Sequence, residues 1–178
     1  LFVAIALCIT LFSLSSVAFS AKTKGSITLT TLDKETKEPI SDAVFRLYSL
    51  ASVYENDDGF FFVYTDSFKD NGMDMGDFSD AYLPIHLAVY AASESVSYTE
   101  KSTDNTGRVI FDDLAVGAYL VVPVSILEGY INPNPFIVTV PARDEVQDKW
   151  IYNIDATPKI EIDKEEILEK TYISVKKH

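Results

Sequence analysis

The sequence predicts an all-β domain, an antiparallel β-sandwich with one short helix inserted in a connection between strands. Three observations support this prediction. Short runs that alternate apolar and polar residues recur along the chain. Turn-forming Gly, Pro, Asn and Asp residues separate these runs. One stretch, 80–95, breaks the rhythm and carries the spacing of a helix. Several short strands joined by turns are typical of sandwiches and barrels.

Alternation defines the strands expected at 25–33, 43–50 and 150–156, and flanking turn residues or prolines mark the others. In the first, 25–33, the residues Ile27, Leu29 and Thr31 share one face, and a charged turn with Pro39 follows. The next strands are expected at 43–50, 60–65, 108–111, 118–123 and 136–141. In the last strand, 150–156, four residues are expected on one face: Trp150, Tyr152, Ile154 and Ala156.

The helix is expected to begin near 81–83, because Pro84 is tolerated only in the first turn of a helix. Asp80 or Ser79 is the expected N-cap. The apolar stripe consists of Leu83, Leu87, Tyr90 and Ala91. Such a helix would lie across one strand-to-strand connection.

The composition is that of a packed domain, since 47% of the 178 residues are hydrophobic and 12% are aromatic. The formal net charge of −12 is opposite in sign to that of a nucleic-acid binder, so nucleic acid is excluded as a partner. The two histidines are too few for most His-based metal centres. We therefore expect no metal and no other cofactor.

Residues 1–20 read as a secretory signal, because an uncharged apolar run is followed by small residues that suit a cleavage site. The basic segment that opens such a signal is missing, so the signal is expected to be truncated. The alternative is an uncleaved membrane anchor, for which the serines at 13, 15 and 16 make a poor span. Cleavage would remove Cys8, which is the only cysteine, and with it any disulfide.

Two segments follow the expected domain at 25–159. Residues 160–170 are charged and lack aromatic core residues, so we expect an interdomain linker there. Residues 171–178 resume a strand pattern that stops partway. We expect this segment to be the start of a following domain, itself truncated.

Five blocks of sequence carry a resemblance to a known family. GSITLTTLDKETKEPISDAVFRLY and TDNTGRVIFDDLAVGAYLVV resemble the SpaA-like, prealbumin-type (Cna B-type) domains of Gram-positive surface proteins. FKDNGMDMGDFSD, NPFIVTVP and KWIYNIDATPK narrow the resemblance to the N-terminal domain of sortase-assembled backbone pilins. The resemblance covers about 25–159. It implies an Ig-like or prealbumin-like sandwich, a structural rather than enzymatic role, and a secreted protein anchored to the cell wall.

The family often carries an intramolecular isopeptide bond between a Lys on the first strand and an Asn or Asp on the last, with a buried acid to move protons. The resemblance sets Thr31 at the Lys position and Val122 or Pro123 at the acid position. We therefore expect no isopeptide bond within 25–159. In the following domain, Lys177 would be the isopeptide lysine, with Lys176 as the alternative. Two solvated strand-edge lysines are an equal alternative.

The resemblance also implies a sortase acceptor. In such pilins a sortase holds one subunit as a thioacyl enzyme, and a Lys amine of the next subunit releases it. By position in the motif, that acceptor is Lys159, which Pro158 would turn outward at the end of a strand. Neighbouring pilin subunits, a pilin-class sortase and a host surface ligand are the expected partners. The alternative for Lys159 is an ordinary linker lysine. The alternative for the protein is a non-polymerising adhesin or stalk domain of a cell-wall-anchored surface protein.

Three further features were weighed for function. An acidic run (Asp70, Asp74, Asp77 and Asp80) lacks the EF-hand spacing and is expected to be a solvated loop, with a weak Ca²⁺ site as the alternative. His86 has no nucleophile-elbow motif to serve and is expected to be half-exposed on the helix. Phe61 is expected in the core, and its exposure would instead mark a contact with a subunit or host ligand.

Overall fold

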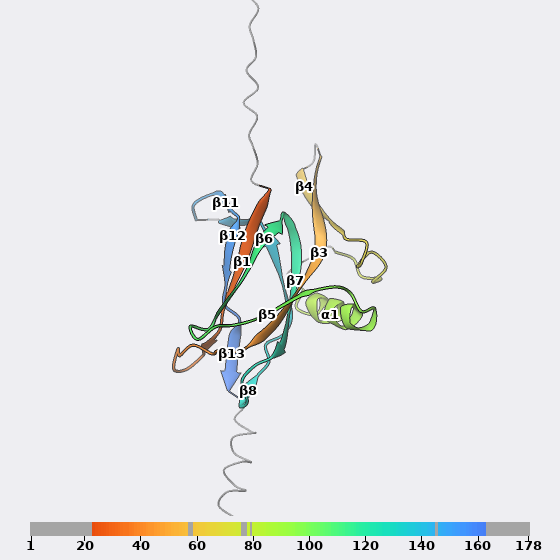
Figure 1. The fold of residues 1–178 in the computed structure, drawn as a ribbon. Helices are drawn as coiled ribbons and strands as arrows, with labels where there is room; N and C mark the ends of the chain where they lie inside the picture. Colours follow the sequence, from red (N-terminus) through yellow and green to blue (C-terminus); the bar gives the residue numbers. More distant parts are fainter. Residues whose placement is uncertain (1–22, 57–58, 76–77, 79, 145, 163–178) are drawn as a thin grey trace, which may run out of the picture.

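The computed structural model describes residues 23–56, 59–75, 78, 80–144 and 146–162 (Figure 1). Two sheets form the body of the domain. The smaller sheet has the strand order β12–β1–β6 and the larger has β4–β3–β7–β9, with β5 also paired to β3. Their bounds are β1 Lys24–Thr30, β3 Val44–Asn56, β4 Gly59–Tyr64, β5 Thr99–Ser102, β6 Arg108–Ala115, β7 Gly117–Ser125, β9 Phe136–Val140 and β12 Asn153–Ala156. The sandwich predicted from the alternation is confirmed.

Apolar side chains from both sheets fill the space between them. Ile27 and Leu29 of β1 are fully buried, as the alternation predicts, and they meet Phe45 and Leu47 of β3. We call this set the inner core. Its other buried members are Ala43, Val109, Phe111, Tyr119, Val121, Val138 and Val140.

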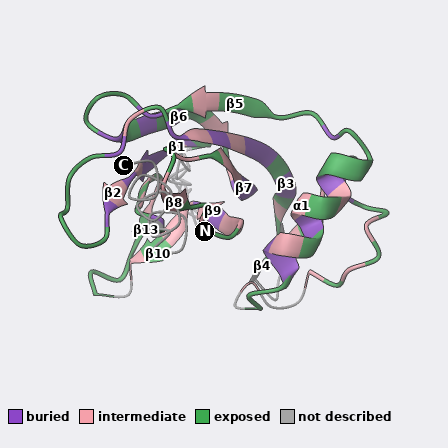
Figure 2. Ribbon diagram, turned by 90° about the horizontal axis from the view of Figure 1, so that it is seen from below, coloured by how far each residue is buried: buried purple, intermediate pink, exposed green. Residues whose placement is uncertain are grey.

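A second apolar layer, the outer core, covers the opposite face of the larger sheet. Helix α1 (Leu83–Ser93) buries Leu83, Leu87 and Ala91 against this face, which confirms the predicted stripe (Figure 2). The sheet supplies the buried residues Tyr48, Leu50, Ala51, Ala118 and Leu120, and Phe68 and Val96 flank the helix. Because β7 is covered on both faces, its sequence is an unbroken apolar run rather than an alternation.

The helix begins at Leu83, within the expected range, but it has no side-chain N-cap. The cap residue is Tyr82, and the carboxylate of Asp80 accepts a hydrogen bond from the Tyr82 backbone N–H at 2.9 Å. Asp80 therefore stabilises the turn that precedes the helix instead of capping it, and Ser79 lies outside the described residues. Pro84 is accommodated in the first turn, as expected.

The end of the chain departs from the predicted pattern. The strand expected at 150–156 is two strands, β11 (Lys149–Ile151) and β12, and β11 pairs instead with β10 (Ala142–Asp144). Trp150 is 45% exposed and lies under the guanidinium of Arg143, so it does not share a core face with Ile154. The prediction for Trp150 was wrong because the chain changes sheets at Tyr152.

Two strand pairings are parallel, in a fold that alternation alone predicted as antiparallel. β1 runs parallel to β12, with Ser26 opposite Asn153 and Leu29 opposite Ala156. The same register continues where β2 (Leu32–Asp33) pairs with β13 (Lys159–Ile162). A third strand, β8 (Tyr130–Ile131), pairs antiparallel with the other side of β13. The expected linker thus begins later than residue 160, since Ile160 is fully buried within β13.

Candidate functional site

Thr31, which the resemblance sets at the isopeptide-lysine position, lies in a buried polar cluster. Its hydroxyl donates to the carbonyl oxygen of Ile40 at 2.6 Å and lies 3.0 Å from that of Gly107. Thr103 also donates to the Ile40 carbonyl, at 2.9 Å. The backbone at Gly107 has φ +72°, and a Cβ there would meet the Thr31 carbonyl oxygen at 2.5 Å. Thr31 thus joins three loops by hydrogen bonds.

Among the described residues, those opposite Thr31 and at the expected acid positions carry no carboxyl or amide side chain. The register that sets Leu29 opposite Ala156 and Leu32 opposite Lys159 brings Thr31 opposite Pro158. At the expected acid positions, Val122 packs on the outer core and Pro123 pairs with Phe45. Neither a proline ring nor a valine can donate or shuttle a proton.

Lys159 is the first residue of β13, the central strand of the sheet β2–β13–β8. Its backbone pairs with Leu32 of β2, and the next residue, Ile160, pairs with Asp33. Farther along the strand, Glu161 pairs with Ile131 of β8. Figure 1 shows β13 and β8 together at the end of the molecule opposite to the start of β1. The strand that begins with Lys159 is therefore held from both sides.

A buried carboxylate connects the two outer strands of this sheet. One oxygen of Asp33 accepts the backbone N–H groups of Glu35 and Thr36, each at 2.7 Å. The other accepts the hydroxyl of Tyr130 at 2.9 Å. The Thr36 hydrogen bond, with help from Tyr130, lowers the pKa of Asp33 despite the opposing effect of burial. The same contact raises the pKa of Tyr130.

An ion pair reinforces this sheet from outside, since Lys34 lies 2.6 Å from Glu161. Both side chains are about half exposed, so the pair contributes little to stability. Sequence reasoning did not single out Asp33 or Tyr130. The signal for Asp33 was present, because an Asp followed by polar residues accepts backbone N–H groups two and three positions on. Nothing in the sequence links it to Tyr130.

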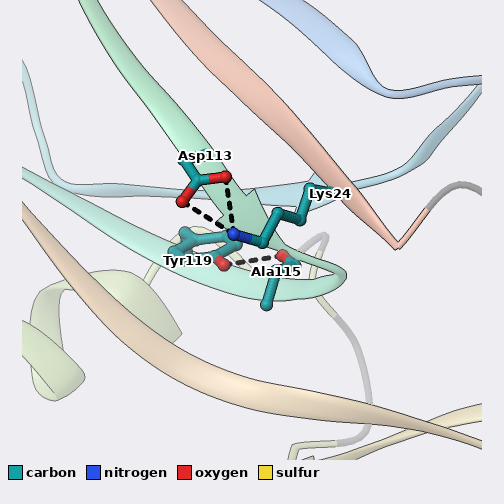
Figure 3. Close-up of polar contacts among 4 residues, drawn as sticks. All are labelled: Lys24, Asp113, Ala115 and Tyr119. Atoms are coloured by element: carbon teal, nitrogen blue, oxygen red, sulfur yellow. Dashed lines mark hydrogen bonds and ion pairs between the residues drawn. The ribbon is translucent and has the colours of Figure 1, made fainter.

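At the opposite end of the sandwich, Lys24 of β1 binds both carboxylate oxygens of Asp113, at 2.6 and 2.7 Å (Figure 3). Beside it, the hydroxyl of Tyr119 donates to the carbonyl of Ala115 at 2.6 Å. Burial raises the pKa of Tyr119. The ion pair is exposed and joins β1 to β6, while the Tyr119 hydrogen bond joins β7 to β6.

The other candidate residues are dispersed. His86 is exposed on α1, and Asp70, Asp74 and Asp80 are exposed around the loop before it. Within the part of the chain that the structure describes, no group of three or more His, Cys, Asp or Glu side chains is arranged to hold a metal ion. Phe61, expected in the core, is 42% exposed and stacks on Tyr54 with ring centroids 5.8 Å apart.

Several expected features lie outside the described residues: the leader at 1–20 with Cys8, most of the linker, Asp77, and the segment with Lys176 and Lys177. Among the residues that are described, no helix is long and apolar enough to cross a membrane.

Comparison with known proteins identifies the class of this domain. The family model for the SpaA prealbumin-like fold domain matches residues 25–154, which is most of the chain. The chain therefore belongs to this family. A search of curated protein sequences found no match.

The chain is similar to solved structures of Gram-positive pilins, and it shares the fold of the first of these. The full-length major pilin SpaD of Corynebacterium diphtheriae is 26% identical with a TM-score of 0.53, over 78% of this chain and 30% of SpaD. The major pilin SpaA of the same organism is 19% identical with a TM-score of 0.48, over 78% of this chain and 30% of that one. The pilus 2b backbone protein of group B streptococcus is 17% identical with a TM-score of 0.47, over 80% of this chain and 42% of that one. The chain thus spans less than a third of SpaD.

Proposed function

We propose that the chain supplies the N-terminal domain of a backbone-type pilin subunit, secreted and anchored at the surface of a Gram-positive bacterium. Sortase joins a neighbouring subunit to it through Lys159. The observation that carries this proposal is the position of Lys159 at the start of β13, a strand paired on both sides at one end of the sandwich. Membership of the SpaA family and the fold shared with the pilin SpaD support it.

In this reaction the domain acts as the acceptor of an acyl group. The uncharged amine of Lys159 attacks the thioester carbon that links the preceding subunit to the sortase cysteine. The C–S bond breaks, an amide bond forms, and the proton released by the amine goes to the departing thiolate. The domain supplies the nucleophile and its position, while the sortase supplies the activated acyl group.

We propose the same domain order that the sequence suggests, with a linker after β13 and a following B-type domain that opens with 171–178. In that domain Lys177, or Lys176, serves as the isopeptide lysine. The non-polymerising adhesin or stalk domain remains the second candidate. The exposed, stacked pair Tyr54 and Phe61 favours it, because an exposed aromatic pair suits a contact with a host ligand.

The two candidates differ in what happens when Lys159 is changed. In the bacterium that produces the chain, Lys159→Ala is expected to abolish covalent high-mass polymers that contain this protein and to leave the monomer. Lys149→Ala is the matched control, because Lys149 is an exposed lysine in the short strand β11. Polymers that persist in Lys159→Ala would reject the acceptor role and favour the adhesin or stalk domain.

A further inference from the structure

The strand β13 is held by short backbone ladders. Within the described residues, it shares two residue pairs with β2 and two with β8. Ladders of this length are weak on their own, because each neighbour contributes little pairing energy. Asp33 and Tyr130 also belong to neither the inner nor the outer core, so apolar packing does not fix β2 and β8 to one another through these residues.

The hydrogen bond between Asp33 and Tyr130 supplies a direct link between β2 and β8. Asp33 lies in β2 and Tyr130 in β8, which are the two outer strands, and β13 runs between them. In the ladder, Asp33 is opposite Ile160 and Tyr130 is opposite Ile162. The bond therefore links one edge of the sheet to the other across the strand that begins with Lys159.

Asp33 is well fixed for this task. Its side chain is bound by two backbone N–H groups, and its own backbone N–H donates to the carbonyl of Glu38 at 2.9 Å. Its backbone carbonyl accepts the N–H of Lys37 at 3.0 Å. The residue is 2% exposed. The carboxylate therefore cannot swing away from Tyr130 without breaking its hydrogen bonds to the backbone N–H groups of Glu35 and Thr36.

We propose that the Asp33–Tyr130 hydrogen bond is a positioning device, which holds β13 in the one arrangement that presents Lys159 to an acyl-enzyme. This inference rests on the proposed acceptor role of Lys159. Neither residue is catalytic, since both act through the strand between them. The chemical reason is that an acyl transfer needs its nucleophile in a fixed place. If the strand samples other arrangements, the apparent affinity for the acyl-enzyme falls in proportion to the competent fraction.

The test is Tyr130→Phe, which removes one hydroxyl and keeps the ring. The chain is incubated with its pilin-class sortase and an LPXTG-type peptide, and peptide joined to Lys159 is counted by mass spectrometry. We expect kcat/KM for the chain to fall roughly tenfold through a raised KM, with kcat little changed. Tyr82→Phe is the control, because Tyr82 is exposed beside α1 and is expected to behave as wild type.

A second pair of variants separates positioning from loss of fold. Asp33→Ala alone and Asp33→Ala combined with Tyr130→Phe should lower kcat/KM by about the same factor, because the Tyr130 hydroxyl then has no partner at position 33. In Tyr130→Phe, hydrogen exchange of the β13 amides should speed up, while the amides of β3 and β7 exchange as in wild type. Unchanged exchange in β13, or faster exchange throughout the domain, would overturn the positioning role.

The outcomes also separate this inference from the proposed function. If the wild-type chain receives no peptide at Lys159, the acceptor role fails, and the positioning role fails with it. If the wild-type chain is joined at Lys159 and Tyr130→Phe is joined equally well, the acceptor role stands and only the positioning role is overturned.

Discussion

At the scale of single residues, Thr31 shows how one buried hydroxyl sets the chemistry of a strand end. The alternation predicts that its side chain points inward with Ile27 and Leu29, and it is fully buried. Its partners could not be predicted, because the carbonyls of Ile40 and Gly107 come from loops distant in sequence. A buried hydroxyl with such partners stabilises the junction of the loops. It has no amine with which to form an amide bond.

We therefore propose that this domain folds without an internal isopeptide bond. The intact mass of the purified domain should equal the mass of its sequence. The Thr31→Lys variant should also have the mass of its own sequence. Val122, Pro123 and Pro158 supply neither the carboxyl group that would move protons nor the Asn or Asp side chain that the lysine would attack. Mass spectrometry decides the question. Loss of one ammonia in either protein would show that a reactive carboxyl or amide group had been misplaced.

At the scale of elements, the sequence was most informative where one face is buried and the other is not. Helix α1 and strand β1 were predicted from such patterns, and β6 was predicted from the Asx and Gly turn that precedes it. The strand β5 was missed because its sequence, TEKS, has no apolar face to reveal it. β13 was assigned to a linker because KIEI is rich in charge, although its two isoleucines alternate. The parallel pairing of β1 with β12 has no signature in local sequence.

The outer core gives a stability prediction for α1. Leu87 is fully buried in it, and Leu87→Ala should lower the free energy of unfolding by about 2–5 kcal/mol because it leaves a cavity. Val89, on the same helix, is 66% exposed. Val89→Ala should change the free energy of unfolding by less than about 0.5 kcal/mol. Urea denaturation of both variants measures this. Equal losses would mean that α1 does not pack on the sheet as described.

The sheet β2–β13–β8 should respond to acid. Because the pKa of Asp33 is lowered in the folded protein, its contribution to stability is complete above the usual value of 3.8 and is lost as pH falls through the lowered value. The ring signals of Tyr130 in NMR should stay constant from neutral pH to about pH 4 and shift only below it. Asp33→Asn should remove that shift. A shift centred well above pH 4 would contradict the assigned hydrogen bonds.

At the scale of the whole molecule, the parallel pairing of β1 with β12 and of β2 with β13 separates the two ends of the domain. β1 begins at one pole, beside the Lys24–Asp113 ion pair, and β13 ends at the other (Figure 1). The larger sheet between them is covered on both faces, by β1 with its neighbours and by α1. A domain entered at one end and left at the other suits a subunit that is joined to others in a line.

The acceptor role of Lys159 is the central claim, and native material tests it most directly. Surface polymers that contain this protein are purified from the bacterium, digested with a protease and sequenced by tandem mass spectrometry. We expect a branched peptide in which the ε-amine of Lys159 carries the C-terminal threonine of a sorting motif. Polymers branched at another lysine, or a protein found only as monomer, would contradict it.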